Sequence, residues 1–163
     1  MSHAITAMIL PGTVDAGAAD RWDLAPVPMR CDLTLFHVTH YYTAYWQAQL
    51  GISSYFELPS EAPGLFPREG VMMTIATELA TRPDPTFAVV LTDYFGGAGD
   101  QWAVVSVDGG PMQSVNTINK ALRALGISAV AGSDEFDTVG LAAHRSTPDY
   151  LDQYVDLCDK LGV

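Results

Sequence analysis

The sequence predicts an α+β protein with a single domain over residues 1–163, in which a central antiparallel hairpin (about 86–108) lies within a small mixed sheet packed against three or four helices. Two runs within 86–108 are rich in β-branched and aromatic residues and flank a glycine-rich turn, which is typical of a hairpin. Elsewhere, apolar residues recur at helical spacing between capping residues, glycines and prolines. No repeat or linker divides the chain, which is long enough to bury a sizeable core.

The register of the hairpin is predicted by matching apolar faces, because a slip of one residue turns every side chain to the other face. We expect Phe95 to face Gln101, which pairs Leu91 with Val105. This register places Asp93 on the apolar face, beside the turn. Such a carboxylate is either functional, with a raised pKa, or a strand-end residue that reaches water.

The segments before the hairpin begin with two predicted strands. Residues 4–10 form an apolar run closed by a Pro-Gly pair, and residues 29–38 place apolar side chains at alternate positions. Residues 13–28 are rich in turn formers, and two prolines near their end oppose a helix. We therefore expect a surface loop between two strands.

Two helices are then predicted. Thr39 is a good capping residue for a helix over 40–50, which Gly51 ends. Residues 52–66 contain two prolines and are predicted as loop. Residues 68–81 form a clear amphipathic helix, ended by the following prolines. Its predicted buried stripe is Met72, Ile75, Ala76 and Leu79.

A helix, a strand and an irregular segment are predicted after the hairpin. The helix begins at Ser114 or Asn116 and reaches Leu125, where a glycine follows. Residues 127–131 are predicted as a short strand, and residues 132–145 as irregular structure that is acidic at its start.

The last helix is predicted over residues 148–161, with hydroxyl residues before it and a proline in its first turn. Its expected buried residues are Leu151, Tyr154, Val155 and Cys158. Four aspartates form a separate stripe, roughly 140° round the helix from the apolar one. They are Asp149, Asp152, Asp156 and Asp159.

The composition is acidic, with 19 Asp and Glu against 8 Lys and Arg and a net charge of −11. Such a surface repels nucleic acid and anionic membranes and favours a basic protein partner, although solubility explains the charge equally well. No run approaches 18 apolar residues, and no basic region precedes the first apolar run, so we expect a cytoplasmic protein without a membrane span. Cys31 and Cys158 lie in apolar patterns and are expected to be reduced and buried.

His37 and His40 suggest a metal site, because histidines three apart on one helix share a face. A strand-to-helix break is predicted between them, which places the pair poorly. Asp93 and His144 would complete a set of metal ligands if the fold brought all four together. No nucleophile, phosphate-loop or zinc-protease motif accompanies them.

The aromatic residues around the first helix are either a core cluster or a binding surface. Neighbouring tyrosines cannot share one helix face, so at least one is expected outside the core. The candidate anchors are Tyr41, Trp46 and Tyr55.

The acidic residues towards the end of the chain are the strongest interaction signal. Like charges on one helix stripe repel each other, so the stripe suggests a basic partner or a cation, while a solvated face is the structural alternative. The candidate partner surface consists of Asp134, Glu135, Asp137, Asp152, Asp156 and Asp159.

Three segments, TDYFGGAGDQWAVV, INKALRALGI and GSDEFDTVGLAAHR, occur in that order within roughly residues 86–161. Together they resemble small bacterial proteins of the immunity type that accompany polymorphic toxin systems. The resemblance implies an acidic protein that masks a toxin, often a basic nuclease. It carries no catalytic motif, so it assigns no catalytic residue.

The sequence thus leads us to expect a protein-binding module without a cofactor, of the immunity type or directed at another basic protein. Two alternatives stay open. One is a metal-dependent hydrolase that uses His37, His40, Asp93 and His144, and the other is a protein that binds a small ligand at its aromatic region.

Overall fold

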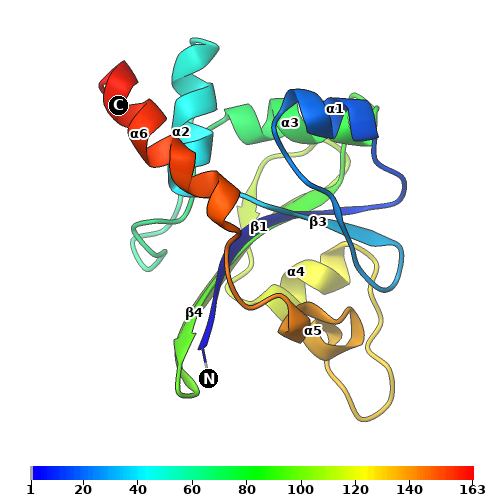
Figure 1. Ribbon diagram of the computed structural model, residues 1–163. Coiled ribbons are helices and arrows are strands. Elements are labelled where there is room, and N and C mark those ends of the chain that lie inside the picture. The colour runs from blue at the N-terminus through cyan, green and yellow to red at the C-terminus, as the bar shows by residue number, and fades with distance from the viewer. Residues whose placement is uncertain (1) are drawn as a thin grey trace.

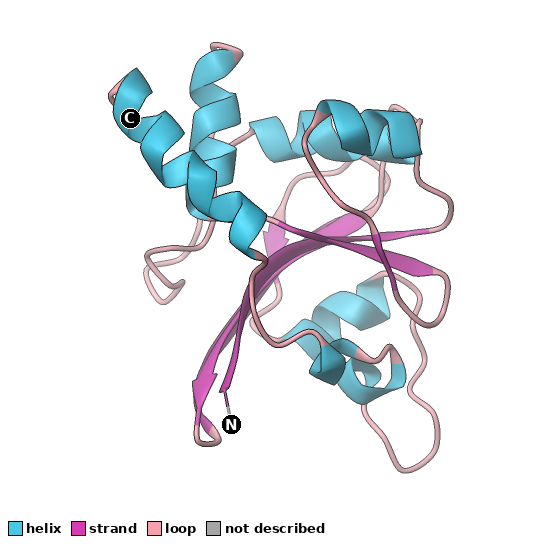
Figure 2. Ribbon diagram, viewed as in Figure 1, coloured by secondary structure: helices cyan, strands magenta, loops and turns pink. Residues whose placement is uncertain are grey.

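The computed structural model describes residues 2–163 and contains one open sheet with helices on both faces (Figures 1 and 2). The strand order is β2-β3-β1-β4-β5-β6, and every pair of named strands is antiparallel. The α+β fold class is therefore confirmed. The strands are β1 (Ser2–Pro11), β2 (Val27–Pro28), β3 (Leu33–His37), β4 (Phe87–Phe95), β5 (Ala98–Ser106) and β6 (Gln113–Ser114).

The helices divide between the two faces of the sheet (Figure 1). One face is covered by α1 (Ala16–Arg21), α2 (His40–Gln49), α3 (Val71–Ala80) and α6 (Gln153–Leu161). The other face is covered by α4 (Ile118–Ala124), α5 (Glu135–Thr138) and the 3-10 helix η1 (Leu141–Ala143). A second 3-10 helix, η2 (Asp149–Asp152), leads directly into α6.

The central strands bury side chains on both faces. In β4, Val89 and Leu91 belong to the core beneath α2, α3 and α6, whereas Ala88 and Val90 belong to the core beneath α4 and η1. Burial on both sides needs a continuous apolar strand, because successive side chains point to opposite faces. Together the two cores hold the long hairpin of β4 and β5 in the middle of the sheet.

The register predicted for this hairpin is wrong. Phe95 pairs with Ala98 rather than with Gln101, and Leu91 pairs with Trp102. The turn consists of Gly96 and Gly97, which have φ angles of 62° and 82°. Positive φ at both central positions is the requirement of the tight turns that match strand twist. Apolar face matching failed because the inner part of β4 is buried on both faces and lacks the alternation that face matching needs. The observed register pairs Phe87 with Ser106.

The helices predicted over 40–50 and 68–81 are confirmed as α2 and α3. The helix predicted after the hairpin is present as α4, but its predicted start is wrong, because Ser114 belongs to β6 and Asn116 has a φ angle of 67°. Thr39 Oγ1 accepts the backbone N–H of Tyr42 at 3.0 Å and caps α2. The stripe predicted for α3 is fully buried, and α4 buries Ile118, Ala121 and Leu122 behind the capping residue Thr117. These helices were predictable because their caps and apolar spacing agree with each other.

Several predictions about short segments are wrong. Residues 13–28 contain α1 and β2, because the Asp15 carboxylate caps α1 by accepting the N–H of Gly17 at 2.8 Å. Residues 127–131 form no strand, and the strand predicted over 29–38 begins only at Leu33. Each of these segments is too short for its hydrophobic periodicity to distinguish strand, helix and coil.

The last helix and the cysteines also differ in part from expectation. Leu151, Tyr154 and Cys158 are buried, but Val155 is 38% exposed. Cys158 is buried and unpaired as predicted, whereas Cys31 is exposed in a left-handed turn with a φ angle of 63°. Among the described residues, no helix is both long and apolar enough to cross a bilayer.

Candidate functional site

A groove of about 580 Å³ opens at the outer end of the hairpin, on the side of α2 and α6. Its walls come from the start of α2, the 63–65 loop, the ends of β1, β4 and β5, and the chain that enters α6. We call it the acidic groove. The lining residues that define it are Asp93, Asp100, Asp152, Tyr41, Leu65 and Val155.

Two of its carboxylates face each other across the hairpin. Asp93 of β4 is the register partner of Asp100 of β5, and both residues are exposed. Like charges directly opposite each other in a sheet are destabilising. Asp93 lies beside the turn and on the face of Leu91, as predicted. The prediction did not include its neighbour Asp100.

In the part of the chain that the structure describes, no lysine or arginine side chain balances this charge. The groove is lined by no Lys or Arg, and the ion pairs between described residues lie elsewhere. They join Arg21 to Glu78, Arg82 to Asp108 and Arg123 to Glu135. Asp152 adds a third carboxylate from η2, so three negative charges share one concave surface.

Apolar side chains complete the groove. Leu91 is buried at its base, while Tyr41, Leu65 and Val155 are 39%, 62% and 38% exposed. A pocket that combines apolar walls with a few charged groups suits a ligand with an apolar stem and a charged head. The exposure of Val155, which the sequence pattern assigned to the core, is explained by its place on this wall.

The wall formed by α2 and α6 is fixed by packing between the two helices. The rings of Tyr42 and Tyr154 meet edge to face, with centroids 4.9 Å apart. Cys158 Sγ donates to the Tyr41 carbonyl at 3.2 Å. Burial raises the pKa of the Cys158 thiol, with a smaller contribution from Asp159, so the proton for this bond is retained. Tyr41 is thus presented to the groove from a rigid support.

The four candidate metal ligands do not come together. His40 and Asp93 line the acidic groove, whereas His37 is buried at the end of β3, where it lies near enough to His144, which follows η1, for their charges to interact. Burial, with a smaller contribution from His144, lowers the pKa of His37 to about 4. Within residues 2–163, no three His, Cys, Asp or Glu side chains form a group able to hold a metal ion.

Of the three candidate aromatic anchors, only Tyr41 lies in the groove. Its ring lies beside that of His40, with centroids 3.9 Å apart. Burial lowers the pKa of His40, and the Glu69 carboxylate opposes this effect. Trp46 packs edge to face against Trp22 at 5.1 Å and belongs to an interior aromatic cluster. Tyr55 is 60% exposed but lies outside the groove.

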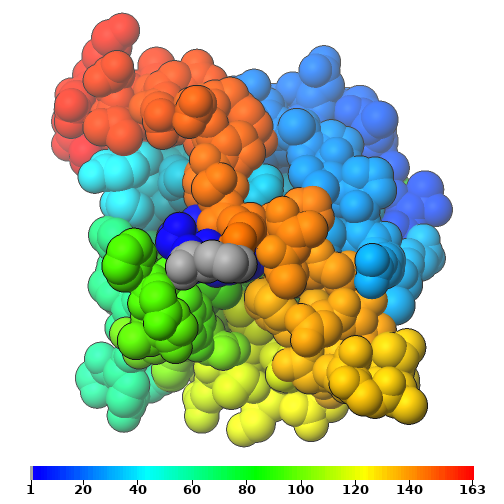
Figure 3. Space-filling view, turned by 60° about the horizontal axis from the view of Figure 1, so that its bottom comes forward, coloured from blue at the N-terminus to red at the C-terminus, as the bar shows by residue number. Residues whose placement is uncertain are grey.

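The six acidic candidates also divide between two surfaces. Asp152, Asp156 and Asp159 are exposed on η2 and α6, whereas Asp134, Glu135 and Asp137 belong to α5 or its cap. Figure 3 shows α6 (red) and residues near 130–137 (yellow-orange) at opposite corners of one face, with residues near 140–150 (orange) between them.

Two of the three acids at α5, Asp134 and Glu135, have structural partners. Asp134 caps the helix by accepting the N–H of Asp137 at 2.9 Å, and it also accepts from the Asn119 amide at 3.1 Å. Both hydrogen bonds lower the pKa of the Asp134 carboxyl group. The Glu135 carboxylate pairs with Arg123 at 2.9 Å. The acids of η2 and α6 have no such ion pair among the described residues, so their charge adds to that of Asp93 and Asp100.

Sequence reasoning missed Asp100 because the predicted register placed it within the turn. The signal that could have found it is the Gly96-Gly97 pair, since a two-residue turn fixes Asp93 opposite Asp100. Leu65 was missed because loop conformation places it, and periodicity says nothing about loops.

No family model, curated protein or solved structure matches this chain. The resemblance to immunity-type proteins therefore stays a prediction, and the function has to be argued from the groove.

Proposed function

We propose that this protein is a binding module for a basic segment of a partner protein, and that the segment docks in the acidic groove. The observation that carries this proposal is the uncompensated pair Asp93 and Asp100 at the edge of a cavity with apolar walls. A repulsive pair lowers the stability of the free hairpin, and a bound cationic group would relieve the repulsion.

The chemistry of the groove favours lysine or arginine side chains. Their aliphatic stems can pack against Leu65, Tyr41 and Val155 while the charged heads reach the carboxylates. A cavity of about 580 Å³ holds a few side chains rather than a domain. It would therefore act as the central anchor of a larger interface, in which a few well-packed residues supply most of the binding energy.

The exposed acids of α6 extend the negative surface beyond the groove. Asp156 and Asp159 lie on the helix that continues from Asp152. Charges at the rim of an interface mainly raise the association rate and make it depend on salt. In the narrower form that the resemblance implies, the partner is a basic toxin and this protein masks it.

A synthetic peptide, acetyl-Lys-Leu-Lys-Leu-Lys-amide, provides the first test. Backbone amide resonances near Tyr41, Leu91 and Asp100 should shift on titration, and the shifts should diminish at high salt because the attraction is screened. The groove variant Asp93→Asn, Asp100→Asn and Asp152→Asn should lose the response.

The control variant Asp20→Asn, Asp32→Asn and Asp137→Asn removes the same charge at three exposed positions outside the groove. It should bind like the wild type. Equal losses in both variants would show a non-specific charge effect, and shifts elsewhere on the surface would contradict the proposed site.

A further inference from the structure

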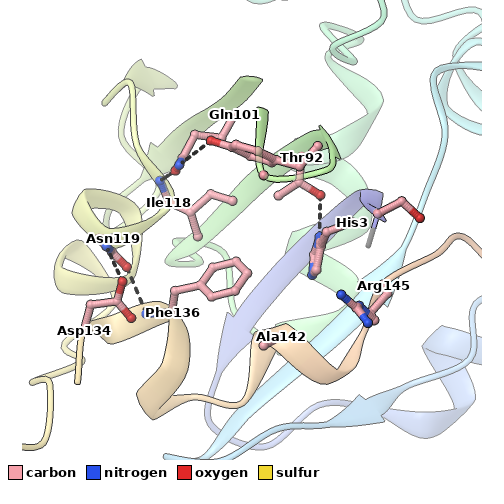
Figure 4. Close-up of a pocket in the computed structure, with 12 residues that line it drawn as sticks. His3, Thr92, Gln101, Ile118, Asn119, Asp134, Phe136, Ala142 and Arg145 are labelled. Atoms are coloured by element: carbon pink, nitrogen blue, oxygen red, sulfur yellow. Dashed lines mark hydrogen bonds between the residues drawn. The ribbon is translucent and has the colours of Figure 1, made fainter. Parts of the chain in front are cut away.

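A second cavity, of about 420 Å³, lies between the hairpin and the layer formed by α4, α5 and η1 (Figure 4). We call it the His3 cavity. Its chemistry differs from that of the acidic groove, because Arg145, Tyr94 and Phe136 contribute to its lining. The residues that matter for the argument are His3, Tyr94, Ile118, Asp134, Phe136 and Arg145.

Most polar groups around the cavity are already engaged, which makes its shape rigid. His3 Nε2 lies 3.1 Å from the Leu141 carbonyl, so this nitrogen must carry a proton and donate it. His3 Nδ1 lies 2.7 Å from Thr92 Oγ1, which also accepts the N–H of Ile5 at 3.1 Å. Both ring nitrogens are therefore hydrogen-bonded within the protein. His3 lines the cavity with its ring and has no nitrogen free to exchange a proton with a ligand.

The opposite side is held by two amides. Asn119 donates to Asp134 at 3.1 Å and accepts the N–H of Phe136 at 2.9 Å. Gln101 accepts the N–H of Ile118 at 2.8 Å and donates to the Tyr94 hydroxyl at 3.0 Å. Tyr94 therefore keeps its own hydroxyl proton available for a ligand.

Arg145 supplies the free charge of the cavity. No carboxylate of the described residues lies within ion-pair distance of its guanidinium. Its carbonyl accepts the N–H of Ala4 at 2.9 Å, which ties its backbone to β1. Figure 4 shows the guanidinium beside His3 and on the opposite side of the cavity from Asp134.

We propose that the His3 cavity binds a small monocarboxylic acid with a flat apolar body. The carboxylate would pair with the Arg145 guanidinium, whose planar fork fits two carboxylate oxygens. The body would pack on Ile118 and on Phe136, whose ring lies 5.4 Å from that of His3. Asp134 on the far side repels a second negative charge, which disfavours phosphates and dicarboxylates. The volume is within the usual range for small-molecule sites.

Binding of 2-naphthoate, followed by amide resonances, tests this proposal. Resonances of Phe136 and Ala142 should shift, and the neutral analogue naphthalene-2-carboxamide should bind roughly tenfold more weakly. Arg145→Gln should weaken 2-naphthoate binding by a similar factor. Arg82→Gln is the matched control, because it removes an exposed guanidinium outside both cavities.

Three results would overturn the proposal. They are the absence of binding at millimolar 2-naphthoate, equal binding of the acid and the amide, and shifts centred on the acidic groove. Because Arg145 is exposed, the glutamine variant should keep the wild-type unfolding transition, so lost binding would not reflect unfolding.

Discussion

Asp93 and Asp100 face each other across the hairpin of β4 and β5, both exposed and neither in an ion pair with a described residue. The pair stands at the rim of a groove whose remaining walls are largely apolar. A protein selected for stability alone would gain from replacing either residue. The first prediction follows from this relationship.

Asp100→Lys should stabilise the isolated protein by about 0.2–1 kcal/mol, because an opposite-charge pair replaces a repulsive one. Asp100→Asn should give a smaller gain, since it only removes the repulsion. Urea unfolding measures both values. A lower free energy of unfolding for Asp100→Lys than for the wild type would show that repulsion at this pair is insignificant.

Gly99→Ala should destabilise the protein by roughly 1–3 kcal/mol, because an added Cβ would collide with the Asp93 carbonyl oxygen and the adjacent Tyr94 backbone. Gly64→Ala is the control, as nothing lies within 4 Å of its added Cβ. The two variants can be compared by thermal and urea unfolding. Equal stabilities would mean that the observed register does not depend on a glycine at position 99.

Gln47→Met should cost about 1–3 kcal/mol, because it leaves the buried Val71 N–H without a partner. The Ser54 carbonyl still accepts the Gly70 N–H at 2.8 Å. Gln47 Nε2 donates to the Ser54 carbonyl at 2.6 Å, and Oε1 accepts the Val71 N–H at 2.9 Å. Gln49→Met is a matched control on the same helix at an exposed position, where an effect within about 0.5 kcal/mol is expected. Similar unfolding free energies for the two variants would contradict this role of Gln47.

The burial of His37 predicts a dependence of stability on pH. The unfolded chain binds a proton at His37 near pH 6.5, whereas the folded chain binds it only near pH 4. The free energy of unfolding should therefore fall by up to about 3 kcal/mol as the pH decreases from 6.5 to 4. Above pH 6.5, His37 should add nothing to the pH dependence of stability. His37→Gln should show a smaller loss on acidification. Parallel pH profiles for the variant and the wild type would refute the assignment.

The sequence was informative where several local signals agreed. In α2 and α3, a cap or stop residue and a helical apolar stripe predicted the same element, and both helices are present. The hairpin itself was also predictable from its glycines. Its register was not, because burial of β4 on both faces removes the alternation on which face matching depends.

The acidic groove could be predicted only in part. Asp152 and Tyr41 were identified from charge and exposure patterns, and Asp93 from its place at the strand end. Their convergence depends on how α2, η2 and the hairpin end meet, which is a property of tertiary packing. Asp134 and Glu135 looked like the same kind of residue in sequence, but a helix cap and an ion pair account for them.

The most direct test of the central claim is the affinity of a basic partner, isolated from the source cell and purified, for three forms of this protein at low and at physiological salt. We predict that the variant with asparagine at 93, 100 and 152 binds at least roughly tenfold more weakly than the wild type and with a flatter salt dependence. The control variant at 20, 32 and 137 should retain the wild-type affinity. Unchanged affinity in the groove variant would contradict the claim that the acidic groove binds the partner.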